Sequence, residues 1–539
     1  MLILGIDTGG TYTDGVIVDR DSREVLYTAK ALTTYDDLSK GIENCIHALG
    51  FSQWEHLGMV SLSTTLATNA IVEGKGCRVG LIVLGRIPEG DIPADIVTRI
   101  DAQINIRGSI KQPLTVQAID DALIPLKGLC DAVAISGYAG VRNPAHEQIV
   151  KQRVKNILGV PAVCGHEMTA SLGYYERTVT AVLNARLLPL IQNLLDNVRS
   201  VMKTLQIQAP LMIVRGDGSL MNADYASERP VETVLSGPAA SVTGALFLSG
   251  HNDGLVVDIG GTTTDIAALR DGECKISEEG ANLSGWKTKV RALEISTFGL
   301  GGDSEIVVSC DGHIAVGPQR VVPLCRSDLV SGRYGLTPTD ILHTSGIYRQ
   351  WDAQKSLDGI QKIASRLGVS GKQLETMLYK AVLEKLKSYC REGLYMLEET
   401  HAVLIGTGAP AISWLNAAAT QMKLPCCVPP HAEVANAIGA AVGKVTERSQ
   451  AIVRRNKMND SFYIYTEKER LEAVSLQVAQ ETARGAVCRI ALEKARCAGA
   501  EDPKVKCKEE LLTDAEESFM EWRITAKALG YPQGNRQEN

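Results

Sequence analysis

Two short segments of the chain carry almost the same run of aspartate, glycine and threonine. Residues 7–14 read DTGGTYTD and residues 258–265 read DIGGTTTD, so six of the eight positions are identical. Paired glycines let the main chain approach a ligand closely, and the exposed N–H groups of such a turn form a nest for anions. Threonine hydroxyls add further donors. The repeat therefore predicts two turns that together bind a pair of linked phosphates.

An aspartate stands at each end of both segments, and these four carboxylates are the candidate catalytic residues. Because a carboxylate repels bare phosphate, we expect Mg²⁺ between them, commonly through water, with Asp7 and Asp258 as its ligands. Asp14 and Asp265 are predicted either to approach the phosphoryl acceptor or simply to cap the turns, and both interpretations stay open. The predicted phosphate-cradling residues are Gly9, Gly10, Thr11, Gly260, Gly261, Thr262 and Thr263.

Apolar runs flank both segments and must position them. Residues 2–6 and 255–257 precede the two copies, and residues 16–18 and 266–269 follow them. Short apolar runs on either side of a glycine turn are typical of a β-hairpin. The alternative is a pair of ordinary glycine hairpins without a ligand. Two other nucleotide signatures, G-x-x-x-x-G-K-[ST] and a G-x-G-x-x-G that opens a helix, do not occur.

Composition limits the class of protein. With 539 residues, a hydrophobic content of 45% and a charged content of 22%, the chain is typical of a globular protein of two to four domains. The net charge of −6 gives no electrostatic reason to expect nucleic acid or an anionic membrane as partner. No apolar run is long enough to span a membrane, and no secretory leader is evident. The 13 cysteines lack C-x-x-C pairs, which favours free thiols and a cytoplasmic location.

Strand-like runs alternate with helical spacing through most of the chain, which indicates an α/β fold. Residues 174–205 predict one long helix that Pro189 could interrupt. After residue 444 the chain becomes richer in charge. A helix near 477–497 and two alternating runs at 504–512 and 519–528 predict a small α+β module that ends in a hairpin.

Five features occur in the order found in the superfamily of sugar kinases, heat-shock chaperones and actin, which the chain resembles. They are the first turn (7–14), a small-residue helix (236–246), the second turn (258–265), an adenosine turn (406–410) and a second small-residue helix (434–443). The resemblance implies two actin-like, ribonuclease H-like lobes around an ATP cleft. The predicted parts are an N-terminal lobe with insertions (1–247), a second lobe (248–445) and an accessory module (446–539).

Within that superfamily the chain is most similar to the hydantoinase A / 5-oxoprolinase family. Besides the two turns, residues 64–70, 175–184 and 236–239 carry the similarity, which extends over about residues 1–445. The sequence departs from the family pattern at three places, where we expect substrate or partner contacts. They are Leu62-Ser63 in place of His-Gly, residues 215–218 in place of Ser-Asn-Gly-Gly, and residues 321–326.

The family resemblance implies an ATP-dependent enzyme subunit that transfers the γ-phosphate to the carbonyl oxygen of a cyclic amide, so that the ring can be opened by hydrolysis. It also implies a B-type partner subunit and an oligomer. Two alternatives stay open: the ATPase subunit of an acetone- or acetophenone-type carboxylase, and an ATP-gated activator or chaperone-like switch. The residues expected around the adenosine are Gly301, Gly302, Asp303, Gly406 and Gly408.

Two further groups of side chains have ordinary interpretations. Glu176 and Arg177 at the start of the long helix are predicted to form a surface salt bridge. His166 and Glu167 lack the second histidine of a zinc-binding helix, so we expect no metal there.

Overall fold

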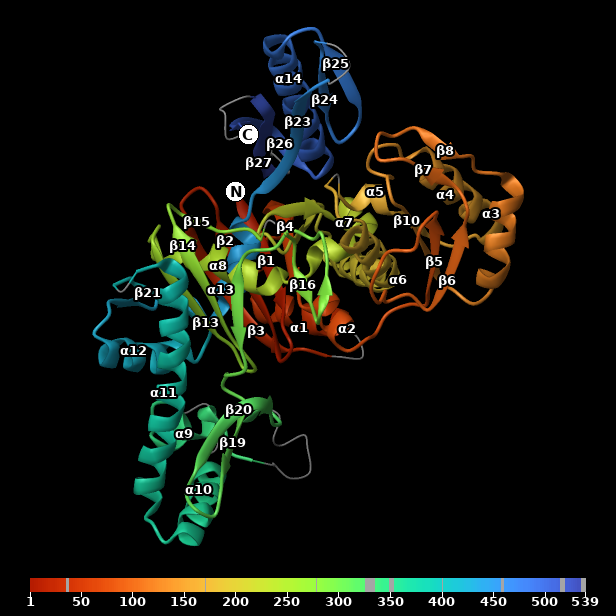
Figure 1. The fold of residues 1–539 in the computed structure, drawn as a ribbon. Coiled ribbons are helices and arrows are strands. Elements are labelled where there is room, and N and C mark those ends of the chain that lie inside the picture. Colours follow the sequence, from red (N-terminus) through yellow and green to blue (C-terminus); the bar gives the residue numbers. More distant parts are fainter. Residues whose placement is uncertain are drawn as a thin grey trace.

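The structure is a computed structural model that describes residues 1–34, 38–169, 171–277, 279–324, 335–348, 353–399, 401–456, 460–513 and 519–534. The chain forms a central body from which three extensions protrude (Figure 1). An α/β unit inserted in the first half lies to one side, a helical extension lies below, and the C-terminal module lies above. The predicted α/β class is confirmed.

The first repeated segment belongs to a mixed six-stranded sheet. Its strands are β1 (Leu2–Thr8), β2 (Tyr12–Asp19), β3 (Glu24–Leu32), β4 (Leu57–Thr64), β11 (Leu211–Val214) and β12 (Leu220–Asn222). The spatial order is β12-β11-β4-β1-β2-β3. Strands β4 and β11 run parallel to β1, whereas β2 and β3 follow in antiparallel succession. The glycine turn joins β1 to β2 in the centre of this sheet.

The second repeated segment belongs to a sheet built in the same way. Its strands are β13 (Gly254–Ile259), β14 (Thr264–Arg270), β15 (Glu273–Cys274), β18 (Ile295–Phe298), β21 (Leu404–Thr407) and β22 (Cys426–Cys427). The order is β15-β14-β13-β21-β22, and β18 also pairs with β14. Again the central strand has an antiparallel hairpin partner on one side and two parallel strands on the other. The sequence repeat therefore marks a repeat of topology.

Two helices of small residues cross between the sheets. They are α8 (Ser236–Ser249) and α13 (Ala435–Val442), close to the predicted ranges. A Cβ atom on Gly244 would lie 2.0 Å from the carbonyl oxygen of Ala435, and one on Gly439 would lie 1.8 Å from that of Ala240. The backbones touch at this crossing, so each glycine is required by the close approach.

The outer faces of the two sheets are covered by other helices. In the first sheet, α1 (Leu38–Ala48) packs on the face opposite α13. In the second, α11 (Gly371–Leu397) and α12 (Ala411–Met422) pack opposite α8. Helices α9 (Pro338–Thr344) and α10 (Gln354–Leu367), with the hairpin of β19 (Ser304–Val308) and β20 (Ile314–Arg320), form the lower extension.

The inserted unit has its own parallel sheet of four strands. They are β5 (Val79–Leu84), β6 (Ile96–Ile100), β9 (Ala132–Gly137) and β10 (Ala162–Cys164), in the order β10-β9-β5-β6. Helices α3 (Val116–Leu123) and α4 (Ala145–Leu158) belong to this unit. The long helix α6 (Tyr174–Thr204) connects it to the body and continues through Pro189 without a break.

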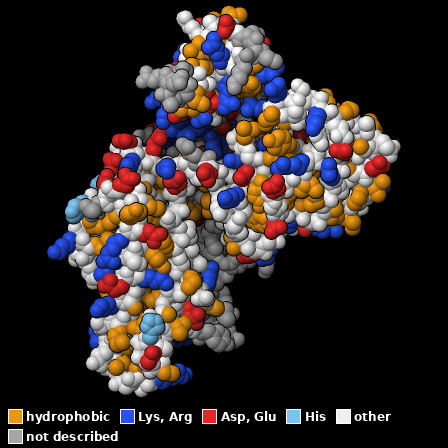
Figure 2. Space-filling view, in the orientation of Figure 1, with side chains coloured by type: hydrophobic (Ala, Val, Ile, Leu, Met, Phe, Trp, Pro, Cys, Tyr) orange, Lys and Arg blue, Asp and Glu red, His pale blue; other side chains and the backbone are white. Residues whose placement is uncertain are grey.

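The C-terminal module is a five-stranded antiparallel sheet with one helix, α14 (Leu476–Cys497), packed on it. The strands are β23 (Val445–Arg455), β24 (Phe462–Tyr465), β25 (Arg470–Ala473), β26 (Ala500–Thr513) and β27 (Phe519–Pro532). The predicted pairing of the last two runs is observed. Lys and Arg side chains gather where this module meets the body (Figure 2). Within the described chain, no helix is long and apolar enough to cross a membrane.

Candidate functional site

Both repeated segments form the predicted β-hairpins, and they do so in the same register. Asp7 pairs with Asp14 across the first hairpin, and Asp258 pairs with Asp265 across the second. In the turns, the amide of Gly9 donates to the carbonyl of Tyr12 at 3.0 Å, and the amide of Gly260 donates to that of Thr263 at 2.9 Å. Each turn therefore places one carboxylate on either strand just below a glycine loop.

The two turns lie close to one another although 251 residues separate them in the sequence. A Cβ atom on Gly261 would lie 3.8 Å from the Thr11 hydroxyl oxygen and 2.7 Å from a carboxylate oxygen of Asp303. The amides of Gly302 and Asp303 donate to the carbonyls of Gly260 and Gly261, at 2.9 and 2.6 Å. Residues 301–303 thus support the second turn at the place where the first turn approaches it.

Asp7 is buried and only partly satisfied. Its Oδ2 atom accepts a hydrogen bond from Asn436 Nδ2 at 3.4 Å, but its Oδ1 atom is buried without a partner among the described residues. The pKa of Asp7 is raised to about 7, chiefly by burial and also by the charges of Asp14 and Asp258, whereas the neighbouring Ser63 and Asn436 lower it. An unsatisfied carboxylate oxygen among like charges is suited to a cation.

Asp258 occupies the equivalent position in the second hairpin with different neighbours. Burial raises its pKa, whereas the hydroxyls of Ser241 and Thr407 lower it. A Cβ atom on Gly408 would lie 2.8 Å from Asp258 Oδ1 and 2.2 Å from the carbonyl oxygen of Ile259. Gly408 has φ +84°, a conformation that glycine adopts without strain. The predicted adenosine turn therefore contacts the second glycine turn directly.

The outer carboxylates have unlike partners. Lys30 Nζ lies 2.6 Å from Asp14 Oδ1 and also donates to the carbonyl of Glu433 at 3.2 Å. Asp265 Oδ1 accepts a hydrogen bond from the Thr297 hydroxyl at 2.6 Å. Burial raises the pKa of Asp265 to about 7, and burial also raises that of Asp14, where the charge of Lys30 opposes it.

The remaining predicted residues divide into two groups. A Cβ atom on Gly10 would meet nothing within 4 Å, so this glycine faces open space. Thr11, Thr262 and Thr263 are half-buried at the turns. Gly406, in contrast, lies inside β21, where a Cβ atom would meet the side chains of Val428, Leu415 and Ala411. Its local role is to let α12 pack closely on the sheet.

Some neighbours of the carboxylates were not predicted from the sequence. Lys30 stands opposite Asp14 in the β2–β3 register, and Thr297 stands opposite Asp265 in the β14–β18 register. Pairing a third strand with each hairpin could have revealed both. Asn436 reaches Asp7 from α13, and no local pattern signals that contact.

Comparison with known proteins is consistent with this geometry. The hydantoinase/oxoprolinase family model matches residues 177–449, and the model of the hydantoinase/oxoprolinase N-terminal region matches residues 3–158. The chain belongs to the hydantoinase/oxoprolinase family. The caprolactamase subunit alpha of Pseudomonas jessenii is 29% identical over 418 residues, which are 68% of this chain and 59% of that protein. The acetophenone carboxylase gamma subunit of Aromatoleum aromaticum is 26% identical over 73% of this chain and 61% of its own length.

This hydantoinase/oxoprolinase chain thus spans about six tenths of the length of these relatives. Two solved structures share its fold over 98% of the chain. Acetone carboxylase in its nucleotide-free form aligns with a TM-score of 0.75 at 18% identity, covering 88% of that chain. The ATP-dependent caprolactamase from Pseudomonas jessenii aligns with a TM-score of 0.73 at 22% identity, covering 87%.

Two of the departures from the family pattern have clear positions in the structure. Leu62 and Ser63 are fully buried in β4, where Ser63 is the register partner of Asp7. Arg215 is buried, and its guanidinium lies 3.0 Å from Glu232 and 2.7 Å from Glu447 of β23. The second departure therefore ties the C-terminal module to the body. The third includes Cys325 and Arg326, which lie outside the described residues.

The predicted surface salt bridge between Glu176 and Arg177 is wrong. Arg177 is completely buried, and its guanidinium donates to the carbonyls of Gly137 and Tyr138 at 2.8 and 3.0 Å. Its position in the first turn of α6 directs the side chain under the inserted sheet, which sequence spacing alone did not indicate. The role of Arg177 is to fasten the end of β9 to α6.

Proposed function

We propose that this chain is the ATP-binding subunit of an enzyme that phosphorylates a carbonyl oxygen of a cyclic amide for ring-opening hydrolysis. The observation that carries the proposal is the approach of the two glycine turns, with Thr11 close to Gly261 and with Asp7 and Asp258 beneath them. Backbone N–H groups of two facing turns would hold the phosphates. The relatives whose names include caprolactamase and 5-oxoprolinase favour a cyclic amide as substrate.

The repeated sheet topology supports two actin-like, ribonuclease H-like lobes with ATP between them. Both central strands end at their glycine turns, and α8 and α13 cross between the two sheets. Gly408 at the end of β21 and residues 301–303 both contact the second turn, so an adenosine would lie beside them. Gly406 would not contact the adenosine itself. It would help to form the site by allowing α12 to pack closely against β21.

The residues present fit Mg²⁺. The orphaned Oδ1 atom of Asp7 and the raised pKa values of Asp7 and Asp258 describe carboxylates that are destabilised until a cation neutralises them. Asp7 and Asp258 would hold the ion, directly or through water. When bound, magnesium supplies positive charge to the phosphates during transfer. Lys30 and Asn436 would then keep Asp14 and Asp7 oriented.

The chemistry expected of the chain is positioning. In the transfer, the amide oxygen forms a bond to the γ-phosphorus while the bond from that phosphorus to ADP breaks. An amide carbon is a poor electrophile, and phosphorylation of its oxygen creates a leaving group. The names of the relatives as alpha, beta and gamma subunits favour a complex in which a B-type partner completes the hydrolysis.

A carboxylase ATPase subunit is the second candidate, because acetophenone and acetone carboxylase subunits are also relatives. The deciding experiment measures ATP hydrolysis with lactams, with hydantoins, and with ketones plus bicarbonate, each with and without the co-purified partner. Stimulation by a lactam or hydantoin supports the proposal, and stimulation only by a ketone with bicarbonate supports the carboxylase. Stimulation by a protein partner alone would favour an ATP-gated switch. Absence of ATP binding by calorimetry would overturn all three.

A further inference from the structure

Two cysteine side chains meet in the C-terminal module. The sulfur of Cys488, on α14, lies 3.3 Å from the sulfur of Cys507, on β26, and the two residues are 19 positions apart in the chain. Both are free thiols. Because they belong to different elements, the packing of the helix on the sheet brings them together. Neither the repeated turns nor the proposed phosphoryl transfer uses this pair.

An ion pair holds the helix against the strand beside the two sulfurs. Arg484 lies one helical turn before Cys488, and its guanidinium donates to the Glu509 carboxylate at 2.7 and 2.9 Å. Glu509 lies two positions after Cys507, so their side chains point to the same face of β26. Residues 484 and 488 of the helix thus contact residues 509 and 507 of the strand, in that order. The contact between the sulfurs is one step of a regular helix–strand interface.

Apolar packing fixes this interface on the other side of the sulfurs. Leu492 lies one turn after Cys488, and Val505 lies two positions before Cys507. Both pack against the main hydrophobic core, and Cys488 packs against it too. The two sulfurs are therefore held between an ion pair and packed apolar side chains, so the fold itself sets their separation.

The pair is open to a small reagent. Cys507 is exposed and Cys488 is half-buried. Strand β26 is at the edge of the sheet order β25-β24-β23-β27-β26, so within the described part of the chain no further strand of this sheet covers Cys507. Burial and the neighbouring Cys488 sulfur raise the pKa of Cys507 to about 11. Cys507 therefore stays protonated when the pair loses its first proton, and it can donate to a thiolate at Cys488.

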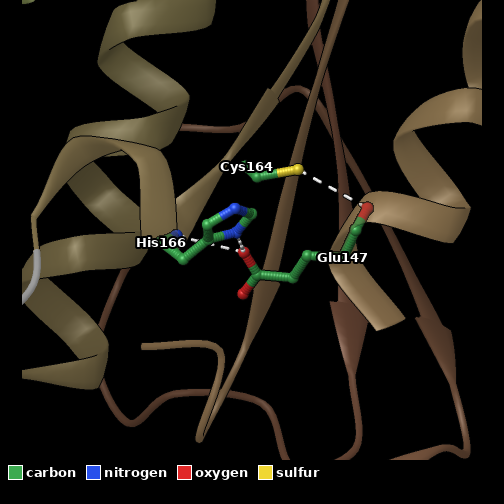
Figure 3. Close-up of side chains that lie close together, drawn as sticks. All are labelled: Glu147, Cys164 and His166. Atoms are coloured by element: carbon green, nitrogen blue, oxygen red, sulfur yellow. Dashed lines mark hydrogen bonds and ion pairs between the residues drawn. The ribbon is translucent and has the colours of Figure 1, made fainter. Parts of the chain in front are cut away.

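A cysteine of the inserted unit has the opposite environment. Cys164 is completely buried, and its sulfur faces the main-chain carbonyl of Glu147 at 3.5 Å (Figure 3). The Glu147 carboxylate accepts from the His166 amide at 3.0 Å and lies 2.6 Å from the His166 ring. The ligand-type atoms of these three side chains lie within 4.8 Å of one another, and their hydrogen bonds account for the arrangement. Burial raises the pKa of Cys164, so this thiol is inert.

We propose that Cys488 and Cys507 form a redox modification site, which a low-molecular-weight disulfide such as glutathione disulfide converts to an intramolecular disulfide bond. The thiolate is the nucleophile in such exchange, and the pair provides both an attacking and a resolving sulfur. A separation of 3.3 Å lies in the range at which reacting atoms are positioned for attack. The site lies in a different module from the glycine turns, so the proposal is independent of the phosphoryl-transfer function.

Two exchange steps complete the reaction. In the first, the Cys488 thiolate bonds to one glutathione sulfur, the S–S bond of the reagent breaks, and one glutathione leaves and takes up a proton. In the second, the deprotonated Cys507 sulfur bonds to the Cys488 sulfur, the mixed S–S bond breaks, and a second glutathione leaves and takes up a proton. Two electrons pass from the protein thiols to the reagent. Because the second attack is intramolecular, it precedes attack by another glutathione molecule.

The test incubates the reduced full chain with glutathione disulfide at pH 8 and then blocks the remaining thiols with N-ethylmaleimide. Peptide mass spectrometry locates the modified cysteines, and an enzymatic assay counts the released glutathione. We expect a peptide pair that is joined through Cys488 and Cys507. The double variant Cys488→Ser with Cys507→Ser gives the release from all other cysteines. Relative to that variant, the parent chain should release two more glutathione molecules and Cys507→Ser only one more.

The single variant also separates the two steps. In Cys507→Ser, the mixed disulfide on Cys488 should last about tenfold longer or more than in the parent chain, because the resolving thiol is gone. The matched control Cys497→Ser removes an exposed cysteine of the same helix and should leave the cross-link unchanged. In the parent chain, Cys497 should carry glutathione without forming a cross-link.

Melting temperature checks that each variant is folded. If Cys507→Ser does not fold, Cys488→Ser carries the test, since Cys507 should then keep a single glutathione. No cross-link under conditions that load glutathione onto Cys497, separate mixed disulfides on both cysteines of the parent chain, or a cross-link between two chains would each overturn the proposal. Asp258→Ala should form the cross-link as the parent chain does, so failure here and failure of the phosphoryl-transfer function are distinguishable.

Discussion

The two glycine hairpins share a sequence, a register and a turn hydrogen bond, yet their outer carboxylates are held differently. Asp14 faces the ammonium of Lys30, whereas Asp265 accepts a hydrogen bond from the neutral hydroxyl of Thr297. The repeated residues determine the shape of the loop, because the conformational freedom of glycine and the pairing of two strands adjacent in sequence both act locally. The neighbouring third strand determines which side chain pairs with the outer carboxylate. Two copies of one motif can therefore have unlike roles in the same site.

The largest effect is expected at the inner carboxylates. Asp258→Ala should lower the turnover of ATP by about a hundredfold or more, because charge compensation around the phosphoryl group is lost. Steady-state ATPase assays with magnesium measure this. Asp460→Ala, at an exposed residue of the C-terminal module, is the matched control and should be unaffected. Normal turnover by a folded Asp258→Ala protein would contradict the proposed role of the second hairpin.

Equivalent glycines of the two turns provide a sharper comparison. Gly10 and Gly261 occupy the same position in the repeat, but only Gly261 is crowded, by Asp303 at 2.7 Å from an added Cβ atom. Gly261→Ala should lower the free energy of unfolding by about 1–3 kcal/mol, as overpacking does. Gly10→Ala should change it by less than about 0.5 kcal/mol. Urea denaturation without nucleotide measures both.

Equal destabilisation by the two substitutions would show that the turns have the same surroundings, against the geometry described. Nucleotide affinity is a separate readout, since both positions would lie beside phosphate. We expect that ATP binding weakens in both variants, and that only Gly261→Ala also unfolds more easily.

Much of the central body could be predicted from the sequence, because its signals are local. Glycine pairs between apolar runs predicted the two hairpins. Runs of Gly, Ala and Ser predicted the two crossing helices, and the structure contains both. What brings Thr11 to Gly261 is tertiary packing, which only the resemblance implied. Arg177 was predicted at the surface because its charge suggests exposure, while its burial depends on the inserted sheet, where it contacts the carbonyls of Gly137 and Tyr138, 40 and 39 residues earlier.

The contacts of the carboxylates show the same limit. Lys30 reaches Asp14 through strand pairing that the sequence could have suggested, but Asn436 reaches Asp7 from a helix more than 400 residues away. The meeting of Cys488 and Cys507 was not predicted either. It depends on how α14 packs against β26, which no local pattern signals.

The outer carboxylates should respond differently when their partners are removed. Lys30→Met leaves Asp14 buried beside other carboxylates and should cost about 1–3 kcal/mol of unfolding free energy. Thr297→Val removes one hydrogen bond from Asp265 and should cost about 1 kcal/mol. Chemical denaturation at pH 8 measures both changes, with the exposed Lys75→Met as control. A larger loss from Thr297→Val would reverse the assignment of Lys30 as the stronger partner.

The inner carboxylate Asp7 and the outer carboxylate Asp265 can also be compared through the slope of stability with pH. Asp7 and Asp265 have pKa values of about 7 in the folded protein, above the value of about 3.9 for an unfolded aspartate. The folded state therefore binds more protons between these values, and its stability is full below pH 4 and declines as pH rises through 7. The slope is at most about 1.4 kcal/mol per pH unit for each group.

Asp7→Asn and Asp265→Asn should each flatten this decline, because the amide keeps the neutral form at every pH. Magnesium should oppose the decline only if Asp7 is present, since its unpartnered Oδ1 is the atom that gains a ligand when the proton leaves. Urea denaturation from pH 4 to pH 8, with and without magnesium, measures both effects. If magnesium stabilises Asp7→Asn as strongly as the parent chain, the ion binds elsewhere and the first hairpin does not hold it.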